Sequence, residues 1–293
     1  MIDLHIHSIM SDGSDYPRVI LDKLVSNNIK TFSITDHDNI AADIEIVKYG
    51  DFLKNNHMEF ITGIEFSADY KGENMHVLAY GFDLNNQVIH DLVSEIHTLR
   101  LNRIRKRLEI LKDEFSIVFS QEEIDWLYSL NNPGKPHIAN LLIKHGYATE
   151  ITPAIKKFMY HNLNSSKVDA IKLVDTLVKN NIIVGIAHPL GGEGDRRLNE
   201  NDLIKNIEDM KNHGISFLEC YYSMYTAEER ESIKRVADKF NLLLSGGSDY
   251  HGTNKDVRLG DLGHDYTPNK DDLTLINKLE KGGYIFDTSK KYI

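Results

Sequence analysis

The chain opens with Asp3-Leu4-His5-Ile6-His7-Ser8, a short stretch in which polar and apolar side chains alternate. Successive side chains of a strand point to opposite faces, so Asp3, His5 and His7 share one face, while Leu4 and Ile6 pack on the other. Burying three polar groups on one face costs free energy unless something binds them. A lone histidine is ordinarily a core or surface residue, but two at i and i+2 beside an acid indicate a pair of metal ligands.

Further polar motifs follow, most of them where a short apolar run ends. They are Ser11-Asp12-Gly13, Thr35-Asp36-His37-Asp38, Gly63-Ile64-Glu65, His76, His188-Pro189 and Gly247-Ser248-Asp249-Tyr250-His251. Each has a simpler structural explanation alone; Asp38, for instance, is well placed as a helix N-cap. Together they lie where parallel strands end, which is the catalytic rim of α/β barrels. Imidazoles and carboxylates without thiolates are typical ligands of hydrolytic divalent metals, so the sequence predicts a multinuclear metal site.

Apolar runs alternate with longer amphipathic stretches, which is the pattern of βα units. Strands are expected over residues 2–7, 30–35, 59–65, 75–81, 182–187, 215–220 and 242–246. Helices are expected over residues 16–28, 40–56, 167–180, 200–213, 227–240 and 271–281. This repetition predicts a fold of the α/β class, either a barrel or a doubly wound sheet.

Residues 88–166 interrupt the rhythm and are predicted to be an all-helical insertion. Val88 to Glu114 carries apolar residues at helical spacing. Ser120-Gln121-Glu122-Glu123 is a capping box that opens another helix. Gly134-Lys135-Pro136-His137 precedes a third helical stretch, and a further helix is expected after Pro153.

The bulk composition is that of an ordinary globular protein. The 293 residues include 41% hydrophobic and 27% charged residues, with a net charge of −10. This acidic balance argues against a stable partnership with long nucleic acid. The single cysteine, Cys220, excludes an intramolecular disulfide and is expected to be a buried thiol. No leader-like segment or long apolar run is present, so we expect a cytoplasmic protein without a membrane partner.

Two other enzymatic interpretations fail on the residues themselves. A hydrolytic triad of Ser248, Asp249 and His251 would place neighbours of one short loop in a geometry that such neighbours rarely adopt. Gly246-Gly247-Ser248 lacks the lysine and the spacing of a phosphate-binding P-loop. Neither class explains the motifs.

The motifs in this order resemble those of the PHP (polymerase and histidinol phosphatase) family of metal-dependent phosphoesterases. The resemblance rests on His5-Ile6-His7, Thr35-Asp36-His37, His188-Pro189 and Ser248-Asp249-Tyr250-His251. It implies a distorted (β/α)₇ barrel over residues 1–87 and 167–293, with residues 88–166 as a helical cap typical of the stand-alone nucleotide phosphatases. Some relatives have histidine where Asp12 stands here, and many have threonine where Asn39 stands.

The resemblance also implies two or three divalent metal ions, with Mn, Fe and Zn all suited to these ligands. One would be held by His5, His7, Glu65 and Asp249. Glu65 would bridge to a second, which His76 and His188 would also hold. A third would be held by Asp12, His37 and His251. Asp249, His188, Glu65 and His251 are the expected catalytic residues, and Lys135, His137, Arg196 and Arg197 are candidates for binding substrate.

The implied reaction is hydrolysis of a phosphomonoester by a metal-bridging hydroxide. The expected substrate is a small nucleotide: a nucleoside monophosphate, a 3′,5′-bisphosphate or the end of a short oligonucleotide. Histidinol phosphate is the alternative substrate. A regulatory module that binds metal without turnover is the alternative of a different class, and it would predict lost ligands. The sequence does not decide the oligomeric state.

Overall fold

A computed structural model describes residues 1–163, 166–193, 196–263 and 268–286. The end of the predicted 167–293 segment, residues 287–293, lies outside the described residues. Within them, the strands are β1 (Ile2–Asp3), β2 (Thr31–Phe32), β3 (Glu59–Phe60), β4 (Gly63–Tyr70), β5 (Glu73–Tyr80), β6 (Val168–Asp169), β7 (Ile183–Ile186), β8 (Phe217–Tyr222) and β9 (Leu243–Gly247).

These strands form two sheets. The smaller is parallel, in the order β1-β2-β3, and the larger is mixed, in the order β6-β4-β5-β7-β8-β9. In the larger sheet β5 is antiparallel to both β4 and β7, and the other pairs are parallel. Single parallel bridges, Ile6 with Tyr250 and His37 with Glu65, connect the two sheets. The chain is therefore an α/β protein, as predicted.

The structure does not confirm a (β/α)₇ barrel, because the described strands form two sheets and no closed barrel. The expected strand over residues 59–65 divides into β3 and the start of β4. β4 then continues to Tyr70 and returns as β5 through a tight turn at Lys71 and Gly72, both of which have positive φ. An antiparallel hairpin needs no crossover helix, so this part of the chain departs from the βα repeat.

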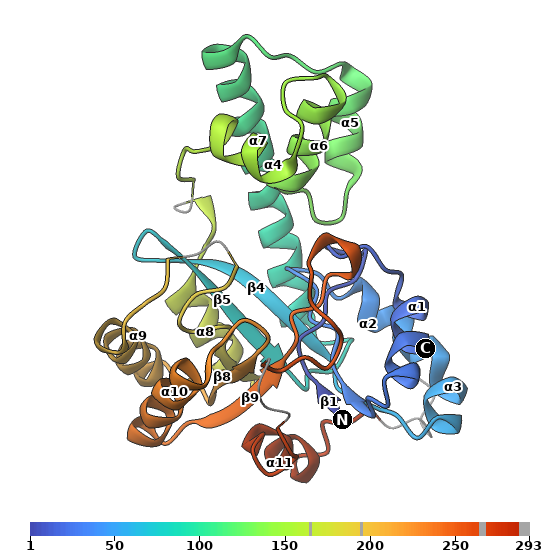
Figure 1. Cartoon of the computed structure of the whole chain (residues 1–293), viewed down its shortest axis with the longest axis vertical. Helices are drawn as coiled ribbons and strands as arrows, with labels where there is room; N and C mark the ends of the chain where they lie inside the picture. The colour runs from blue at the N-terminus through green and yellow to red at the C-terminus, as the bar shows by residue number, and fades with distance from the viewer. Residues whose placement is uncertain (164–165, 194–195, 264–267, 287–293) are drawn as a thin grey trace.

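The helices expected outside the insertion are present, with ends that shift by a few residues. They are α1 (Pro17–Ser26), α2 (Ala41–Ile46), α3 (Gly50–Asn55), α8 (Ala170–Lys179), α9 (Glu200–Asn212), α10 (Ala227–Phe240) and α11 (Thr274–Lys281), with short 3₁₀ turns at η1 (Val47–Tyr49) and η3 (Gly252–Asn254). α1, α2 and α3 lie beside the small sheet, while α8, α9 and α10 lie beside the large one (Figure 1). Each group covers its own cluster of buried apolar side chains.

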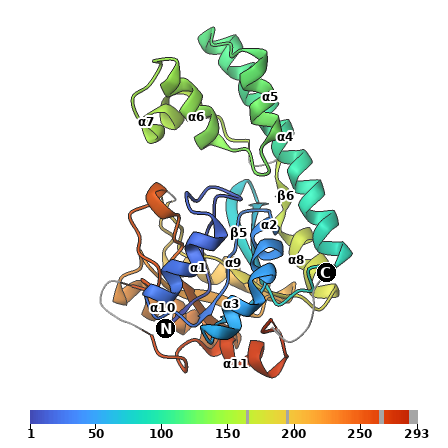
Figure 2. The ribbon, with the colours of Figure 1, turned by 90° about the vertical axis from the view of Figure 1, so that its right-hand side faces the viewer.

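Four helices lie within residues 88–166 or begin one residue before. They are α4 (Gln87–Phe115), α5 (Gln121–Ser129), α6 (Lys135–Lys144) and α7 (Ile151–Phe158). α5 begins with the predicted capping box, in which the side chains of Ser120 and Glu123 each bond the other's backbone. These helices share a third apolar cluster, and α4 runs from it down to the sheets (Figure 2). None of the described helices combines the length and the apolar character needed to cross a bilayer.

Candidate metal centre

Glu65 is the centre of the site and lies within β4, 1% exposed. Five imidazoles surround its two oxygens: Oε2 lies 3.1 Å from His5 Nε2, 3.1 Å from His7 Nε2 and 3.2 Å from His37 Nδ1, and Oε1 lies 2.8 Å from His76 Nδ1 and 3.0 Å from His188 Nε2. Burial alone would raise the pKa of Glu65, but these imidazoles hold it well below its usual value. We call these six side chains, with Asp12, Asp249 and His251, the imidazole–carboxylate cluster.

The hairpin explains how Glu65 and His76 meet. In the β4–β5 ladder His76 lies opposite Ser67, so these two side chains are on the same face of the sheet. Glu65 precedes Ser67 by two residues and therefore points to that face as well. Both residues lie inside strands rather than at strand ends, where the sequence had placed Glu65.

The other members come from chain segments that follow strands. His5 and His7 follow β1, where the backbone N–H of His7 donates to Tyr250 O and that of Asp249 donates to His5 O. These bonds tie the first segment to the one after β9. His188 and Asp249 both have positive φ, at 28° and 57°. That backbone conformation is strained for a residue other than glycine, and it is found most often at functional sites.

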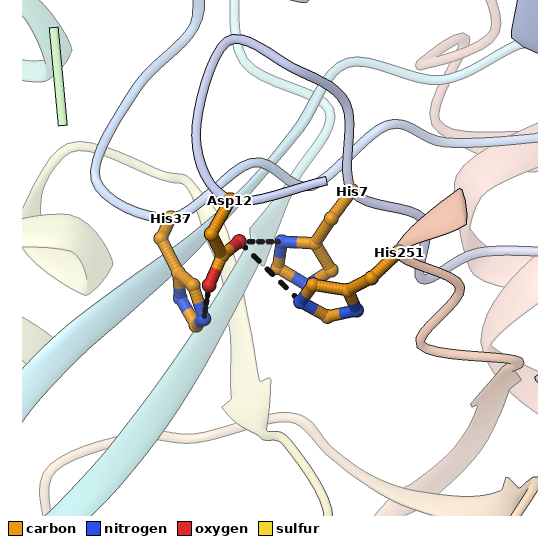
Figure 3. Close-up of side chains that lie close together, drawn as sticks. All are labelled: His7, Asp12, His37 and His251. Atoms are coloured by element: carbon orange, nitrogen blue, oxygen red, sulfur yellow. Dashed lines mark ion pairs between the residues drawn. The ribbon is translucent and has the colours of Figure 1, made fainter. Parts of the chain in front are cut away.

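Among the described residues, three groups of side chains have ligand atoms within 4.8 Å of one another. They are His5, His7, Glu65 and Asp249; His37, Glu65 and His76; and His7, Asp12, His37 and His251. The last group surrounds the carboxylate of Asp12, whose Oδ1 lies 3.3 Å from His251 Nε2 and 3.6 Å from His7 Nδ1, and whose Oδ2 lies 3.7 Å from His37 Nε2 (Figure 3). His188 adjoins the second group through Glu65.

The grouping differs in detail from the ligand sets that the sequence suggested. The first set is the same. His37 belongs to the second group as well as the third, and His7 belongs to the third as well as the first. His188 reaches Glu65 but is not in a three-residue group. All nine predicted ligands nonetheless lie in one cluster.

Several buried atoms in this cluster form no hydrogen bond, and divalent cations would engage them. His7 Nδ1, His37 Nδ1 and Glu65 Oε2 are buried and have no hydrogen-bond partner. An unsatisfied buried polar atom costs free energy. Each of these atoms can donate a lone pair to a metal, once any proton that it carries has left. The donor set of nitrogen and carboxylate oxygen therefore fits two or three divalent metals.

The pKa values of the imidazoles depend on which carboxylates face them. Burial opposes the charged form of His7, but the carboxylates of Asp249, Glu65 and Asp12 outweigh it and raise the pKa of His7 to about 10. Burial dominates for His37, and with the help of the charges on His7 and His76 it lowers the pKa of His37 to about 3. Neutral His37 is in the form that binds a metal.

Several residues that the sequence did not single out hold the ligands in place. Glu219 accepts a hydrogen bond from His5 Nδ1 at 2.8 Å and another from the backbone N–H of His188 at 2.8 Å. Glu219 is a lone acid in the apolar strand β8, and that signal was visible in the sequence. On the other side of the cluster, Asp249 Oδ2 accepts from Lys255 Nζ at 2.5 Å and from Tyr222 OH at 3.0 Å.

Asp3 shares the first strand with His5 but serves the scaffold. Its carboxylate accepts from the backbone N–H and the hydroxyl of Ser248, at 2.9 and 2.6 Å, and from the backbone N–H of Gly260 at 2.8 Å. Burial raises its pKa to about 6 despite these bonds. Asp3 therefore anchors the segment that carries Asp249.

A cavity of about 440 Å³ lies beside the cluster, between the sheets and helices α4 and α6. Asp12, His37 and His76 line one wall. The other lining residues include one acid, Glu73, and five cationic side chains: Arg100, Arg103, Arg107, Lys135 and Lys167. We call this space the cationic cavity. Apart from the metal ligands Asp12, His37 and His76, only Lys135 and His137 of this cavity were predicted as site residues, because the arginines look like the solvated face of a long helix.

Burial and mutual repulsion act on these cations together. Lys167 is the clearest case, because burial, followed by the charges of Arg103 and Arg100, lowers its pKa to about 7. Burial likewise lowers the pKa of Lys135 and of His137. An anion in the cavity would reverse these shifts.

The two remaining candidates for substrate binding lie elsewhere. Arg197 forms an ion pair with Glu229 at 3.3 Å and donates to the backbone carbonyls of Gly191 and Met224. It therefore fixes the loop after His188. Arg196 lines a second cavity, next to His188.

Comparisons with known proteins agree with this geometry. The PHP domain model matches residues 3–184. A 5'-3' exoribonuclease of Haemophilus influenzae is 26% identical over 85% of this chain and 89% of its own. A 3',5'-nucleoside bisphosphate phosphatase of Chromobacterium violaceum is 22% identical over 90% of each chain. The solved structure of a candidate metal-dependent phosphoesterase from Bifidobacterium adolescentis has a TM-score of 0.77 and 22% identity over 96% of each chain.

Proposed function

Since the chain belongs to the PHP domain family, we propose that it hydrolyses a phosphomonoester of a small nucleotide. It is a metal-dependent hydrolase of phosphoric ester bonds. The finer proposal names a nucleoside monophosphate, a 3′,5′-bisphosphate or the end of a short oligonucleotide as substrate. Relatives named as a bisphosphate phosphatase and an exoribonuclease support this choice of substrate class.

The observation that carries the proposal is the cationic cavity. One wall holds Asp12, His37 and His76 of the imidazole–carboxylate cluster, and the others hold five cations. A single phosphate at the metals would leave most of those cations without a counter-charge. Charge-assisted hydrogen bonds to phosphate are the usual way to satisfy such groups. The cavity therefore favours substrates with a second anionic group, as in a bisphosphate or an oligonucleotide end.

Divalent ions bound in the cluster would lower the pKa of water and offset the charge that develops on the phosphoryl oxygens. Glu65, Asp249, Asp12 and the six histidines of the cluster would hold them. Asp249 Oδ1 faces His7 Nε2 at 3.2 Å, and we assign it the role of accepting the proton of the attacking water. Lys255 holds the other oxygen of Asp249, so the acceptor stays oriented toward the cluster.

Protonation of the leaving oxygen falls to a histidine at the edge of the cluster. With the group of Asp12, His37 and His251 free of metal, His251 is the candidate, because its side chain is 14% exposed and its Nε2 faces Asp12. Its Nδ1 lies 2.9 Å from the backbone carbonyl of Asp249, which fixes the ring and leaves Nε2 toward Asp12, a residue that lines the cationic cavity. His188, at 8% exposure and bonded to Glu65, has the more restricted position.

We also propose that residues 88–166 act as a cap on a catalytic domain formed by residues 1–87 and 167–293. The cations of the cavity come mostly from this segment, on α4 and α6. Arg100 on α4 donates to Asp38 Oδ2 at 2.7 Å, which links the cap to the segment carrying His37. A cap that supplies cations and contacts a ligand segment would select substrate as well as exclude water.

Histidinol phosphate is the less favoured substrate, because its ammonium group would meet a cavity that is already cationic. A regulatory module without turnover is also less favoured. None of the nine expected ligand positions is lost in the sequence.

The deciding experiment is a panel of substrates assayed with the purified protein and manganese. Nucleoside monophosphates, 3′,5′-bisphosphates, short oligoribonucleotides and histidinol phosphate would be compared by kcat/KM. His188→Ala and Asp249→Ala proteins, prepared in parallel, control for contaminating phosphatases. We expect a bisphosphate or an oligonucleotide end to be preferred. Preference for histidinol phosphate over every nucleotide would overturn the proposal.

A further inference from the structure

A second cavity, of about 280 Å³, adjoins the cluster on the side of His76 and His188. It lies between the turn of the β4–β5 hairpin, the end of β7 and the first turns of α9. Glu73, Asn74 and His76 line both this cavity and the cationic one. The two spaces therefore meet at the start of β5, beside the site where phosphate would be hydrolysed.

The walls of the second cavity are chemically unlike those of the first. Seven apolar side chains line it, together with Tyr70: Met75, Ile186, Ala187, Pro189, Leu198, Leu203 and Ile207. Lys71 also lines it, but its charge is paired with Asp209 at 2.9 Å. We call it the apolar cavity. A second phosphate would gain little there, whereas a flat, mostly apolar ring would bury its faces against these side chains.

Two polar side chains in the apolar cavity are available to a ligand. Within the part of the chain that the structure describes, the side chains of Arg196 and Asn206 form no hydrogen bond or ion pair, and both line the cavity. An asparagine amide offers one acceptor and two donors, which match the paired donor and acceptor on the edge of a base. A guanidinium stacks on aromatic faces.

We infer that the apolar cavity binds the base of the substrate nucleotide, with Asn206 at the base edge and Arg196 over its face. This inference rests on the proposed function and adds the orientation of the substrate across the site. The second anionic group of the substrate lies in the cationic cavity, the phosphoryl group lies at the imidazole–carboxylate cluster, and the base lies beyond His76 and His188.

The test compares a substrate with its baseless counterpart. Adenosine 3′,5′-bisphosphate and the corresponding abasic ribose bisphosphate present the same phosphates, so their ratio of kcat/KM isolates the contribution of the base. Stacking of a base on a protein side chain contributes about 1–3 kcal/mol. That range corresponds to a ratio between about 5 and 150 for the wild-type protein.

Three variants locate the effect. Asn206→Ala and Arg196→Ala each remove a polar contact to the base and should lower the ratio at least threefold. Leu203→Phe enlarges a buried side chain in the wall of the cavity and should lower the ratio further. Lys205→Ala, on an exposed position of the same helix, is the matched control and should keep the wild-type ratio.

A binding measurement that needs no turnover supports the kinetics. Fluorescence of 2-aminopurine riboside, titrated with metal-free protein, should change on binding to the wild-type and Lys205→Ala proteins, and much less with Asn206→Ala.

Equal turnover of nucleotide and abasic substrate by the wild-type protein would overturn the inference while leaving the proposed function intact. Absence of phosphatase activity on every substrate, with nucleoside binding retained, would overturn the proposed function instead. A wild-type preference that the Asn206, Arg196 and Leu203 variants all retain would place the base elsewhere and also refute the inference.

Discussion

The imidazole–carboxylate cluster and the cationic cavity share a wall but treat charge in opposite ways. In the cluster, the histidines around Glu65 hold the pKa of that carboxylate well below its usual value. In the cavity, cations face other cations, and the pKa of Lys167 falls to about 7. The first region holds its own counter-charges. In the second, Asp38 pairs with Arg100, and among the described residues no carboxylate pairs with the other four cations. The difference indicates that the cluster suits cations and that the cavity suits an anion.

The largest effect should follow from removing the carboxylate on which the cluster converges. Glu65→Gln leaves the shape of the site unchanged but removes the charge that five imidazoles face. We expect kcat to fall by about a thousandfold or more, since the loss of one electrostatic group at a reacting centre costs on the order of 10²–10³ and Glu65 belongs to two ligand groups. Steady-state kinetics with manganese measures it, and bound metal is counted by elemental analysis.

Glu109→Gln, an exposed acid on α4, is the control and should behave as wild type. If Glu65→Gln kept most of its activity and its metal, the cluster would not be the catalytic centre, and its contrast with the cationic cavity would have no bearing on catalysis.

Glu219→Gln should have a smaller effect and acts through His5 and His188 rather than on substrate. The amide keeps one hydrogen-bond acceptor but loses the charge that orients His5. Partners of this kind typically contribute about 10–100-fold to metal affinity. Titration of metal-free protein with Mn²⁺ or Zn²⁺ should show a weaker Kd, and excess metal should restore most of the kcat. Unchanged affinity with a lowered kcat would show instead that Glu219 acts on the reaction directly.

Lys135→Gln tests the other region. The lysine lines the cationic cavity, and its ammonium group forms no hydrogen bond or ion pair with any of the described residues. We expect kcat/KM for a 3′,5′-bisphosphate to fall about tenfold, the equivalent of about 1.4 kcal/mol for one charged hydrogen bond. The value for a substrate with a single phosphate should change little, because the cluster alone would hold it.

Lys156→Gln, an exposed lysine on α7, controls for the change in net charge. An equal loss on substrates with one phosphate and with two would mean that Lys135 serves the reacting phosphoryl group, and that the two regions are one site.

The sequence predicted the cluster better than the cavity, and the reason is physical. His5, His188 and Asp249 are polar residues next to buried strands, and the edges of neighbouring strands bring such residues together whatever the details of pairing. Arg100, Arg103 and Arg107 are spaced along a helix in a pattern that equally fits a solvated face. Only tertiary packing of α4 against α6 turns them toward a common space.

The predicted (β/α)₇ barrel is not confirmed, and the hairpin is where the described strands depart from it. The sequence predicted strands over residues 59–65 and 75–81 and missed the extension of β4 to Tyr70, and periodicity does not indicate the direction in which strands pair. The turn at Lys71-Gly72 was a readable signal, because glycine suits the positive φ that tight hairpins need. It is this antiparallel pair that places Glu65 and His76 on one face, so the error concerned the fold and left the site intact.

The smallest expected effect concerns a carboxylate that is buried as deeply as Glu65 but has no cation beside it. Asp43 on α2 is fully buried; its Oδ1 accepts from the backbone N–H of Gly63 at 2.9 Å, and its Oδ2 has no partner. Burial, supported by the charge of Asp36, raises the pKa of Asp43 well above its usual value. If histidines are what keep Glu65 charged, burial without them should favour the neutral acid.

Asp43→Asn mimics that neutral acid and keeps the acceptor for Gly63. In the wild-type protein, stability falls as pH rises from about 3.8, where the unfolded chain releases this proton, through the higher pKa of the folded state. The amide of the variant has no proton to release, so its stability should not fall in this way. The variant should therefore match the wild-type protein in stability near pH 4 and exceed it increasingly toward neutral pH. Each kcal/mol gained raises Tm by roughly 2–4 °C in a protein of this size class. Thermal unfolding at several pH values measures this difference in stability, with Asp51→Asn on the surface of α3 as the control.

A variant less stable than wild type at neutral pH would show that Asp43 is ionised in the fold. The contrast with Glu65 would then need a cause other than the imidazoles.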